Sequence, residues 1–154
     1  MGAGGSEIYF SYPSDFSFTV KTPEEIAEEN FDKQELEQFV LDFRDAYRQS
    51  LTDKNFKLAS PYLTPDSAAY KELIEFIGDL GDDYYHYDFT LNEVTGTEVT
   101  EDEAIVSTYE EFTFTNHKDE VTHYERDKKY SIQLNNDGEF EIHKIKIEDT
   151  KRNR

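Results

Sequence analysis

The sequence contains no cysteine and no tryptophan, and Met1 is its only methionine. The absence of cysteine excludes disulfides, thiol nucleophiles and cysteine-ligated zinc. No apolar run approaches the ~20 residues needed to span a bilayer, and no charged start followed by an apolar stretch indicates a signal peptide. The length of 154 residues suits one compact domain better than two independent ones.

Basic residues are also scarce: 16 lysine and arginine residues stand against 35 aspartate and glutamate residues, a formal net charge of −19. A surface of that sign argues against a protein that grips nucleic acid or anionic lipid as a whole. The charge is uneven, because residues 1–120 hold 8 basic and 28 acidic residues whereas residues 121–154 hold 8 and 7. The 12 phenylalanine and 11 tyrosine residues supply large rings for a core and argue against disorder.

Capping and proline signals predict that the first half of the chain is helical. The expected helices start at Thr22-Pro23, at Asp32 with an end near Leu51, at Thr52-Asp53 with an end near Pro61, and at Thr64-Pro65 with an end at Gly81. The helix that Asp32 begins carries apolar residues at helical spacing, which predicts a buried face. These residues are Leu36, Phe39, Val40, Phe43 and Tyr47.

From Tyr84 onward the pattern changes to alternation, which predicts strands. Tyr85, Tyr87, Phe89 and Leu91 are expected on the core side, and Gly96 and Glu101-Asp102 at turns. The last strand contains a change of phase, because Phe140 and Ile142 have one parity and Ile145 and Ile147 the other. We therefore predict a β-bulge near His143-Lys144. The fold class is α+β, with N-terminal helices packed on a curved antiparallel sheet of about four strands.

Two stretches carry a family resemblance. The runs 39–47, 53–56 and 61–67 resemble the helical start of the nuclear-transport-factor-two-like (NTF2-like, cystatin-like cone) superfamily, over roughly residues 32–147. The tail through 130–134 and 142–147 is similar to the C-terminal extracellular domain of TcaA-type membrane proteins, a family associated with teicoplanin resistance. The expected organisation is a glycine-rich expression remnant at 1–6, an arm or linker with a short helix at 7–31, a cone domain at 32–148 and a basic tail at 149–154.

The resemblance implies a non-enzymatic extracellular domain, held at the outer face of the cytoplasmic membrane of a Gram-positive bacterium by an anchor outside this sequence. Such a domain would bind or sense a cell-wall or envelope component and influence the response to glycopeptide antibiotics. Neither a cofactor nor a nucleic-acid partner is expected. Homodimerisation through the open face of the sheet stays open, although the outward row Tyr109, Glu111, Thr113 and Thr115 is polar.

The basic end of the chain supplies one candidate binding site. With the predicted bulge, Lys129 falls opposite Lys146, and three further basic residues lie nearby: Arg126, Lys128 and Lys144. Like charges that face each other destabilise a sheet unless an anion relieves them, which suggests an anionic wall polymer or an acidic neighbouring domain as the partner. Alternatively, Glu125 and Asp127 neutralise the patch, and the lysines only keep the strand edges soluble.

A pocket inside the cone supplies the alternative, a small-molecule binder or an isomerase- or cyclase-like enzyme. Its candidate residues are His86, Asp88, Phe112, Tyr124 and Tyr130, with His86 or Asp88 as the base. Alternation places His86, Asp88 and Tyr84 away from the core side, so solvent exposure is favoured over catalysis for them. Asp82, Asp83 and His86 lack a calcium-loop pattern, and no metal site is predicted.

Overall fold

The computed structural model describes residues 20–81 and 85–153. In this part the elements follow in the order α1 (Pro23–Asn30), α2 (Lys33–Asp53), two short 3-10 helices η1 (Phe56–Leu58) and η2 (Ser60–Tyr62), α3 (Ala68–Asp79), β1 (His86–Val99), β2 (Ala104–Thr115), β3 (Val121–Leu134) and β4 (Phe140–Asn153). The predicted remnant at 1–6, most of the predicted arm, and Asp82, Asp83 and Tyr84 lie outside the described residues. The α+β fold class is confirmed.

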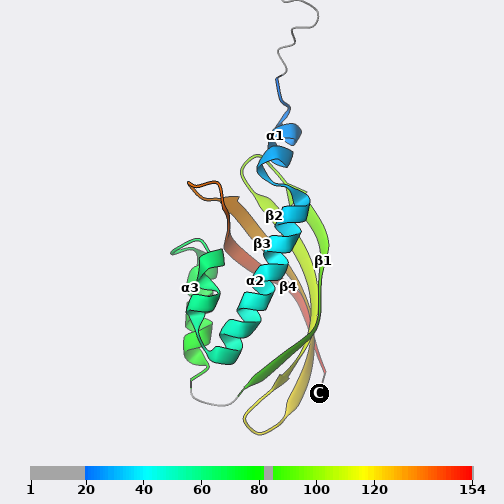
Figure 1. Ribbon diagram of the computed structural model, residues 1–154. Helices are drawn as coiled ribbons and strands as arrows, with labels where there is room; N and C mark the ends of the chain where they lie inside the picture. The colour runs from blue at the N-terminus through cyan, green and yellow to red at the C-terminus, as the bar shows by residue number, and fades with distance from the viewer. Residues whose placement is uncertain (1–19, 82–84, 154) are drawn as a thin grey trace, which may run out of the picture.

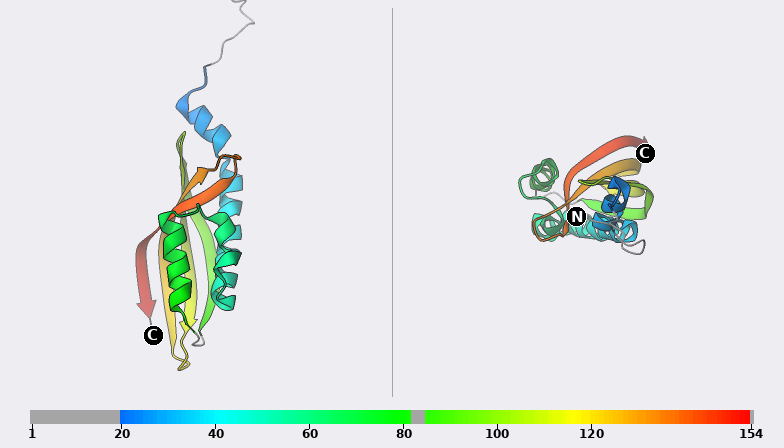
Figure 2. Two further views of the ribbon diagram at one scale, coloured as in Figure 1. Left: turned by 90° about the vertical axis from the view of Figure 1, so that its left-hand side faces the viewer. Right: turned by 90° about the horizontal axis from the view of Figure 1, so that it is seen from above.

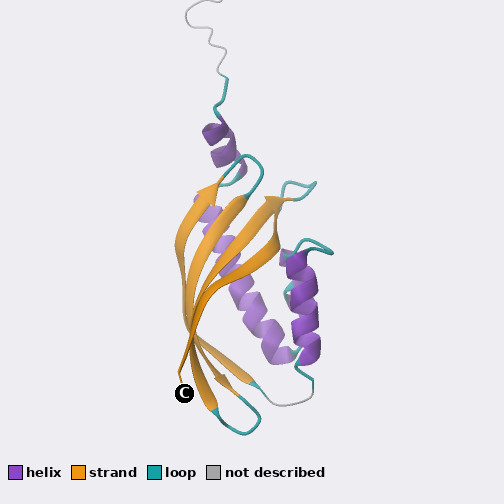
Figure 3. Ribbon diagram, turned by 180° about the vertical axis from the view of Figure 1, so that it is seen from behind, coloured by secondary structure: helices purple, strands orange, loops and turns teal. Residues whose placement is uncertain are grey.

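The four strands form one antiparallel sheet in the order β1-β2-β3-β4. Helices α2 and α3 lie on the same side of this sheet (Figure 1), and the view from behind shows the opposite face of the strands uncovered (Figure 3). The strands bend as they run, so the sheet is concave towards the two helices (Figure 2). We call the space between the concave face and the helices the cone. Helix α1 projects from one end of the molecule, where Asn30 donates a hydrogen bond to the carbonyl of Glu101.

Side-chain caps start the helices largely as the sequence predicts. Thr22 forms a capping box with Glu25 at the start of α1, and Asp32 accepts a hydrogen bond from the backbone N–H of Glu35 in α2. The predicted start at Thr64-Pro65 is wrong, because Ser67 caps α3. The physical reason is that the backbone N–H of Thr64 donates to the carbonyl of Ile142 on β4, which keeps this segment extended beside the sheet.

The segment after α2 also differs from the prediction. Helix α2 continues to Asp53 and ends where Lys54 adopts a left-handed conformation, with φ of 53°. The expected second short helix is reduced to η1 and η2, and Asn55 caps η1 in place of the Thr52-Asp53 pair. The segment 54–67 runs back along the sheet, so α3 runs in the same direction as α2 (Figure 1) and the two helices end near each other, where Nζ of Lys54 donates a hydrogen bond to the carbonyl of Gly81.

One apolar face of α2 packs on the concave face of the sheet, chiefly along β1, and fills the end of the cone nearest to α1. The larger apolar side chains of the core with 0% exposure are Leu36, Val40, Phe43, Val106, Tyr130, Ile132 and Ile142. The ring of Phe43 lies 5.9 Å from the ring of Tyr130 in an edge-on arrangement. Burial of such side chains contributes about 1.5–3 kcal/mol each, so this end of the cone is the stable base of the domain.

The predicted bulge in the last strand is confirmed. Ser131 pairs with Lys144 and Ile132 with Ile142, which leaves His143 as the extra residue. The bulge turns Ile145 towards the core, whereas Ile147 on the same face remains 51% exposed. A second bulge leaves Glu148 unpaired between Ile147 and Asp149, and β4 then continues to Asn153, past the predicted end of the domain at residue 148.

Two register shifts in β1 change which of its residues face inward. Thr90 is left unpaired after Phe89, so Leu91 is 37% exposed and its predicted place on the core side is wrong. Asn92 turns inward in its place and accepts a hydrogen bond from Arg44. Gly96, predicted in a turn, lies within β1 beside the second shift.

Candidate functional site in the cone

The wide end of the cone contains a pocket of about 280 Å³ that is lined mainly by aromatic rings. Alternation along β1, β2 and β3 places their rings on the concave face, and α2 and α3 close the pocket from the other side. The lining side chains are Tyr47, Phe76, Tyr87, Phe89, Glu110, Phe112, Phe114, Tyr124 and Arg126. The pocket therefore combines an apolar wall with two charged groups.

A second pocket of about 200 Å³ adjoins the first, because Tyr47, Phe76 and Arg126 line both. Its other walls are more aliphatic and include Leu73 on α3 together with Ile145 and Ile147 on β4. The buried cations Arg44 and Lys128 also reach it. We call the two pockets together the hollow of the cone.

Three charged side chains meet at the wall of the hollow. The guanidinium of Arg44 on α2 forms an ion pair with the carboxylate of Glu110 on β2, and Nζ of Lys128 on β3 lies 3.5 Å from the second oxygen of Glu110. The exposed fractions are 2% for Arg44, 1% for Glu110 and 5% for Lys128. Arg44 also donates hydrogen bonds to the hydroxyl of Tyr130 at 3.2 Å and to Asn92 at 3.3 Å. A single carboxylate is thus shared by two buried cations.

Burial alters the protonation of this cluster. Desolvation, together with the positive charges of Arg44 and Arg126, lowers the pKa of Lys128 to about 7, although Glu110 acts in the opposite direction. Desolvation likewise raises the pKa of Tyr130 to about 12, so its hydroxyl stays protonated near neutral pH. The ammonium of Lys128 also lies 5.0 Å from the ring centroid of Tyr47, a cation–π contact. Lys128 is therefore a titratable group in the neutral range.

Arg126 on β3 differs from these buried cations because it has no carboxylate partner within ion-pair distance among residues 20–81 and 85–153. Its guanidinium lies over the rings of Phe112 and Tyr124, 5.3 and 5.5 Å from their centroids. Its Nε donates a hydrogen bond to the hydroxyl of Thr150 on β4. The remaining N–H groups of Arg126 are available at the wall of the hollow.

The five basic residues that the sequence groups together lie on two faces of the sheet. Arg126 and Lys128 line the hollow. Lys129 on β3 and Lys146 on β4 belong to the other face of the sheet, where they lie directly opposite each other, as predicted. Glu148 contacts both of these lysines, at 3.6 and 3.1 Å, so an acidic side chain of the same hairpin relieves their repulsion. The fifth residue, Lys144, is exposed and pairs with Ser131.

The residues of the predicted alternative pocket also separate. Phe112 and Tyr124 line the hollow, and Tyr130 is fully buried below it. His86 and Asp88 are exposed and alternate with the inward-facing Tyr87, as the alternation predicts. Neither of these two side chains reaches the hollow, so they do not supply a base there.

Four residues of the site were not predicted as such from the sequence: Arg44, Tyr47, Phe76 and Glu110. The signal for Glu110 was present, because Glu110 shares its parity with Val106 and Phe112 on β2. Arg44 follows Phe43 and lies four residues after Val40 in the apolar stripe of α2. A charged residue at a core-facing position on each of two facing elements indicates a buried ion pair.

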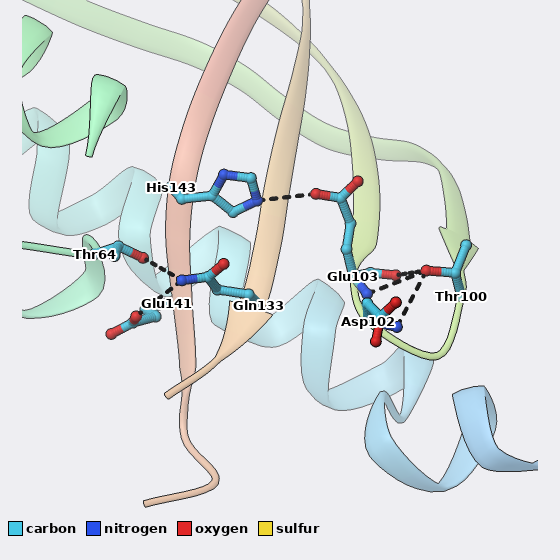
Figure 4. Close-up of polar contacts among 7 residues, drawn as sticks. All are labelled: Thr64, Thr100, Asp102, Glu103, Gln133, Glu141 and His143. Atoms are coloured by element: carbon cyan, nitrogen blue, oxygen red, sulfur yellow. Dashed lines mark hydrogen bonds and ion pairs between the residues drawn. The ribbon is translucent and has the colours of Figure 1, made fainter. Parts of the chain in front are cut away.

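Two separate groups of polar contacts tie β4 to other parts of the fold (Figure 4). Nε2 of His143 lies 2.9 Å from a carboxylate oxygen of Glu103, and Gln133 donates hydrogen bonds to Thr64 and Glu141. None of these five side chains lines the hollow. Their contacts hold the bulged strand in place.

Two absences concern residues 20–81 and 85–153. No cluster of three or more histidine, aspartate or glutamate side chains is arranged to hold a metal ion in these ranges. No helix within them is both long and apolar enough to cross a bilayer.

The fold and the hollow define the chain as an NTF2-like α+β protein, in agreement with the solved structures that it resembles. The intermembrane-space region of the chloroplast protein ARC6 matches with a TM-score of 0.64 and 12% identity, over 76% of this chain and 96% of that one. An NTF2-like superfamily protein from Salmonella enterica serovar Typhimurium matches with a TM-score of 0.57 and 13% identity, over 75% of this chain and 89% of that one. A ketosteroid isomerase-like protein from Erwinia carotovora atroseptica matches with a TM-score of 0.55 and 16% identity, over 75% of this chain and 95% of that one.

The family assignment is narrower than the fold. Residues 32–146 match the family described as the TcaA protein NTF2-like domain, so the chain belongs to that family. The search of curated proteins returned no match. The resemblance noted in the sequence is thereby confirmed.

Proposed function

We propose that this chain is a non-enzymatic, extracellular binding domain of a membrane-anchored cell-envelope protein in a Gram-positive bacterium. It recognises an anionic wall component and thereby influences the response to glycopeptide antibiotics, which act on the same wall. Membership of the TcaA NTF2-like domain family supports the envelope role. The observation that carries the binding role is the charge of the cone, where Glu110 is shared by Arg44 and Lys128 and Arg126 has no carboxylate partner within the described residues.

The arrangement favours binding over acid–base catalysis. A general base needs a carboxylate or imidazole that is free to take a proton from a bound substrate. Glu110 is the carboxylate in the aromatic pocket, and both of its oxygens face buried cations. His86 and Asp88, the predicted bases, lie outside the hollow.

The small-molecule enzyme remains the second candidate because the hollow has aromatic walls and an inward carboxylate. One of the similar structures is described as ketosteroid isomerase-like, and at 16% identity this likeness shows the fold alone. Turnover of a ketosteroid or related cyclic ketone that is lost in Glu110→Gln would favour this candidate over the binding domain.

The contact with the anion is assigned to Arg126 and Lys128. On the opposite face, Lys129 and Lys146 are already paired with Glu148, and the exposed Lys144 lies opposite Ser131. An anion that approaches that face meets no uncompensated cluster of cations. Inside the cone, low dielectric strengthens the attraction between the anion and Arg126.

The test is binding of the domain to intact Gram-positive cell walls, with and without wall teichoic acid, across a salt series. We expect binding that needs the anionic polymer and weakens with salt, because charge attraction is screened. Arg126→Gln should weaken it, and the double variant Lys129→Gln/Lys146→Gln should leave it unchanged. Loss in the double variant alone would overturn the assignment to the cone, and no binding to either wall would overturn the proposed function.

A further inference from the structure

We propose that the hollow of the cone binds a small amphipathic anion, whose charged group lies against Arg126 and whose flat apolar body lies among the rings of β1, β2 and β3. This inference rests on the proposed function for the location of the site, and it names the chemical class of ligand. It goes beyond attraction of a polyanion to a basic surface. Three features of the hollow carry it.

The first feature is a continuous layer of rings on three neighbouring strands. The ring of Phe112 on β2 lies 4.9 Å from that of Phe89 on β1 and 4.8 Å from that of Tyr124 on β3. The planes of Phe112 and Tyr124 differ by only 6°. Tyr87 and Phe114 extend the layer with a centroid distance of 4.9 Å. Such a layer offers flat apolar surface to a planar ligand, because aromatic groups gain by offset stacking.

The second feature is the position of Arg126 at the edge of this layer. Its guanidinium rests on two of the rings, and Thr150 fixes its Nε, so the side chain is oriented before a ligand arrives. The N–H groups that remain have the planar geometry that suits a carboxylate, phosphate or sulfonate. A ligand whose body stacks on the rings therefore places its charged group within reach of Arg126.

The third feature is the exposed apolar surface around the opening. Phe76 on α3 is 40% exposed and Ile147 on β4 is 51% exposed, and both line the hollow. The partly buried Ile145 and the buried Leu73 continue this surface inward. A ligand with an apolar body would cover these side chains, whereas a hydrated polyanion would leave them in water.

The charge of the rest of the molecule limits a wall polymer to the entry of one short segment and favours a ligand that brings a single charged group into the cone. The chain carries a formal net charge of −19, and Glu72 is exposed at the α3 side of the second pocket. A long polyanion that entered the cone would have to pass along this acidic surface. A small anion whose apolar part enters the pocket leaves less charge near those carboxylates. Buffer anions alone, such as inorganic phosphate, lack the apolar part and should bind weakly.

The experiment compares two fluorescent probes of nearly the same shape. 8-Anilinonaphthalene-1-sulfonate carries an anionic group on an aromatic body, and N-phenyl-1-naphthylamine is its uncharged analogue. We expect the sulfonate to bind the wild-type domain, and Arg126→Gln to weaken its binding by about tenfold or more, as for the loss of a hydrogen bond to a charged group. Arg126→Lys should restore part of this affinity, and binding of the uncharged analogue should change little in either variant.

Two further variants control for the fold and for charge alone. Arg48→Gln removes an exposed arginine of α2 that lies outside the hollow, and it should bind both probes as the wild type does. Tyr124→Ala removes one ring of the layer and should weaken both probes. Because the sulfonate also binds partly unfolded chains, each variant is first shown to keep a cooperative thermal unfolding transition followed by far-ultraviolet circular dichroism.

The outcomes separate this inference from the proposed function. Equal binding of the sulfonate by the wild type and by Arg126→Gln overturns the inference, and so does absence of sulfonate binding. If wall binding requires Arg126 but the sulfonate does not bind, the ligand class is overturned and the proposed function stands. If the sulfonate binds through Arg126 but neither wall is bound, the inference stands and the envelope function is overturned.

Discussion

Arg44 on α2 and Glu110 on β2 form an ion pair at the centre of the cone, and neither side chain is more than 2% exposed. Removal of two charges from water carries a penalty of several kcal/mol per ion, which only a well-placed partner offsets. The pair therefore joins the long helix to the second strand at one defined position. The ion pair also neutralises the carboxylate of Glu110, which faces the hollow, so the remaining cations give the hollow a net positive charge.

The first prediction concerns the stability that depends on this pair. Glu110→Gln leaves Arg44 and Lys128 buried without their counter-ion. We expect the free energy of unfolding to fall by about 3–5 kcal/mol, the usual loss when one partner of a buried pair is removed. Urea denaturation followed by circular dichroism measures the change.

The matched control is Glu93→Gln, the same substitution at an exposed position of β1. We expect its effect to remain within about 0.5 kcal/mol. The double variant Arg44→Met/Glu110→Leu removes both charges and should recover much of the loss, since apolar replacement of a whole pair is often neutral. A double variant less stable than Glu110→Gln would show that the pair is favourable beyond neutralisation.

The second prediction concerns the protonation of Lys128. Burial lowers the pKa of this lysine from an ordinary 10.5 to about 7, so its ammonium should titrate in the neutral range. Nuclear magnetic resonance of the lysine side chains across a pH series measures this directly, and Lys128→Met assigns the signal by its absence. A midpoint near 10.5 would show that water reaches Lys128 in solution.

The same shift predicts how stability depends on pH. Between about pH 7 and 10.5 the unfolded chain retains the proton that Lys128 has released in the folded state. Stability rises with pH wherever the unfolded state binds more protons. The free energy of unfolding of the wild type should therefore rise across this interval relative to Lys128→Met. A parallel pH profile for the two proteins would contradict the assignment.

The sequence predicted the layers of this fold because its strongest signals are local. Thr22 and Asp32 cap their helices through their own side chains, and the phase change between Ile142 and Ile145 located the bulge at His143. Each of these signals depends on neighbours within a few residues. Tertiary contacts did not override them, and the predictions were confirmed.

The errors share the opposite property, because each depends on a partner far away in the sequence. Thr64 failed to start α3 because its backbone pairs with Ile142, and Leu91 faces outward because β1 bulges against β2. The five basic residues of the candidate site were grouped because the predicted hairpin brings them together, and strand parity divides them between the two faces of the sheet. Local sequence patterns cannot show that Glu110 pairs with Arg44, since the two residues are 66 positions apart in the sequence.

The third prediction concerns the bulge itself. Deletion of His143 from β4 would restore regular alternation with Ile142 and Ile145 both facing inward, so the domain should still fold. The matched control is deletion of Ser107 from β2, because β2 pairs with β3 in one continuous register. This deletion would turn Thr108 and the residues after it to the wrong face of the sheet. We expect a cooperative thermal transition for the first deletion and none for the second. Equal loss of folding would show that the bulge geometry is itself indispensable.

The last prediction links ligand binding to protonation. An anion held beside Arg126 favours the charged form of Lys128, which lines the same pocket and also faces Glu110, Arg44 and Tyr47, with Glu72 at the rim. Binding of 8-anilinonaphthalene-1-sulfonate should therefore weaken as the pH rises through about 7, and calorimetry in buffers of different ionisation enthalpy should show proton uptake at neutral pH. The sulfonate does not titrate in this range, so the pH dependence belongs to the protein. Lys128→Met should bind with little pH dependence and no proton uptake, and an unchanged slope in that variant would assign the titration to another group.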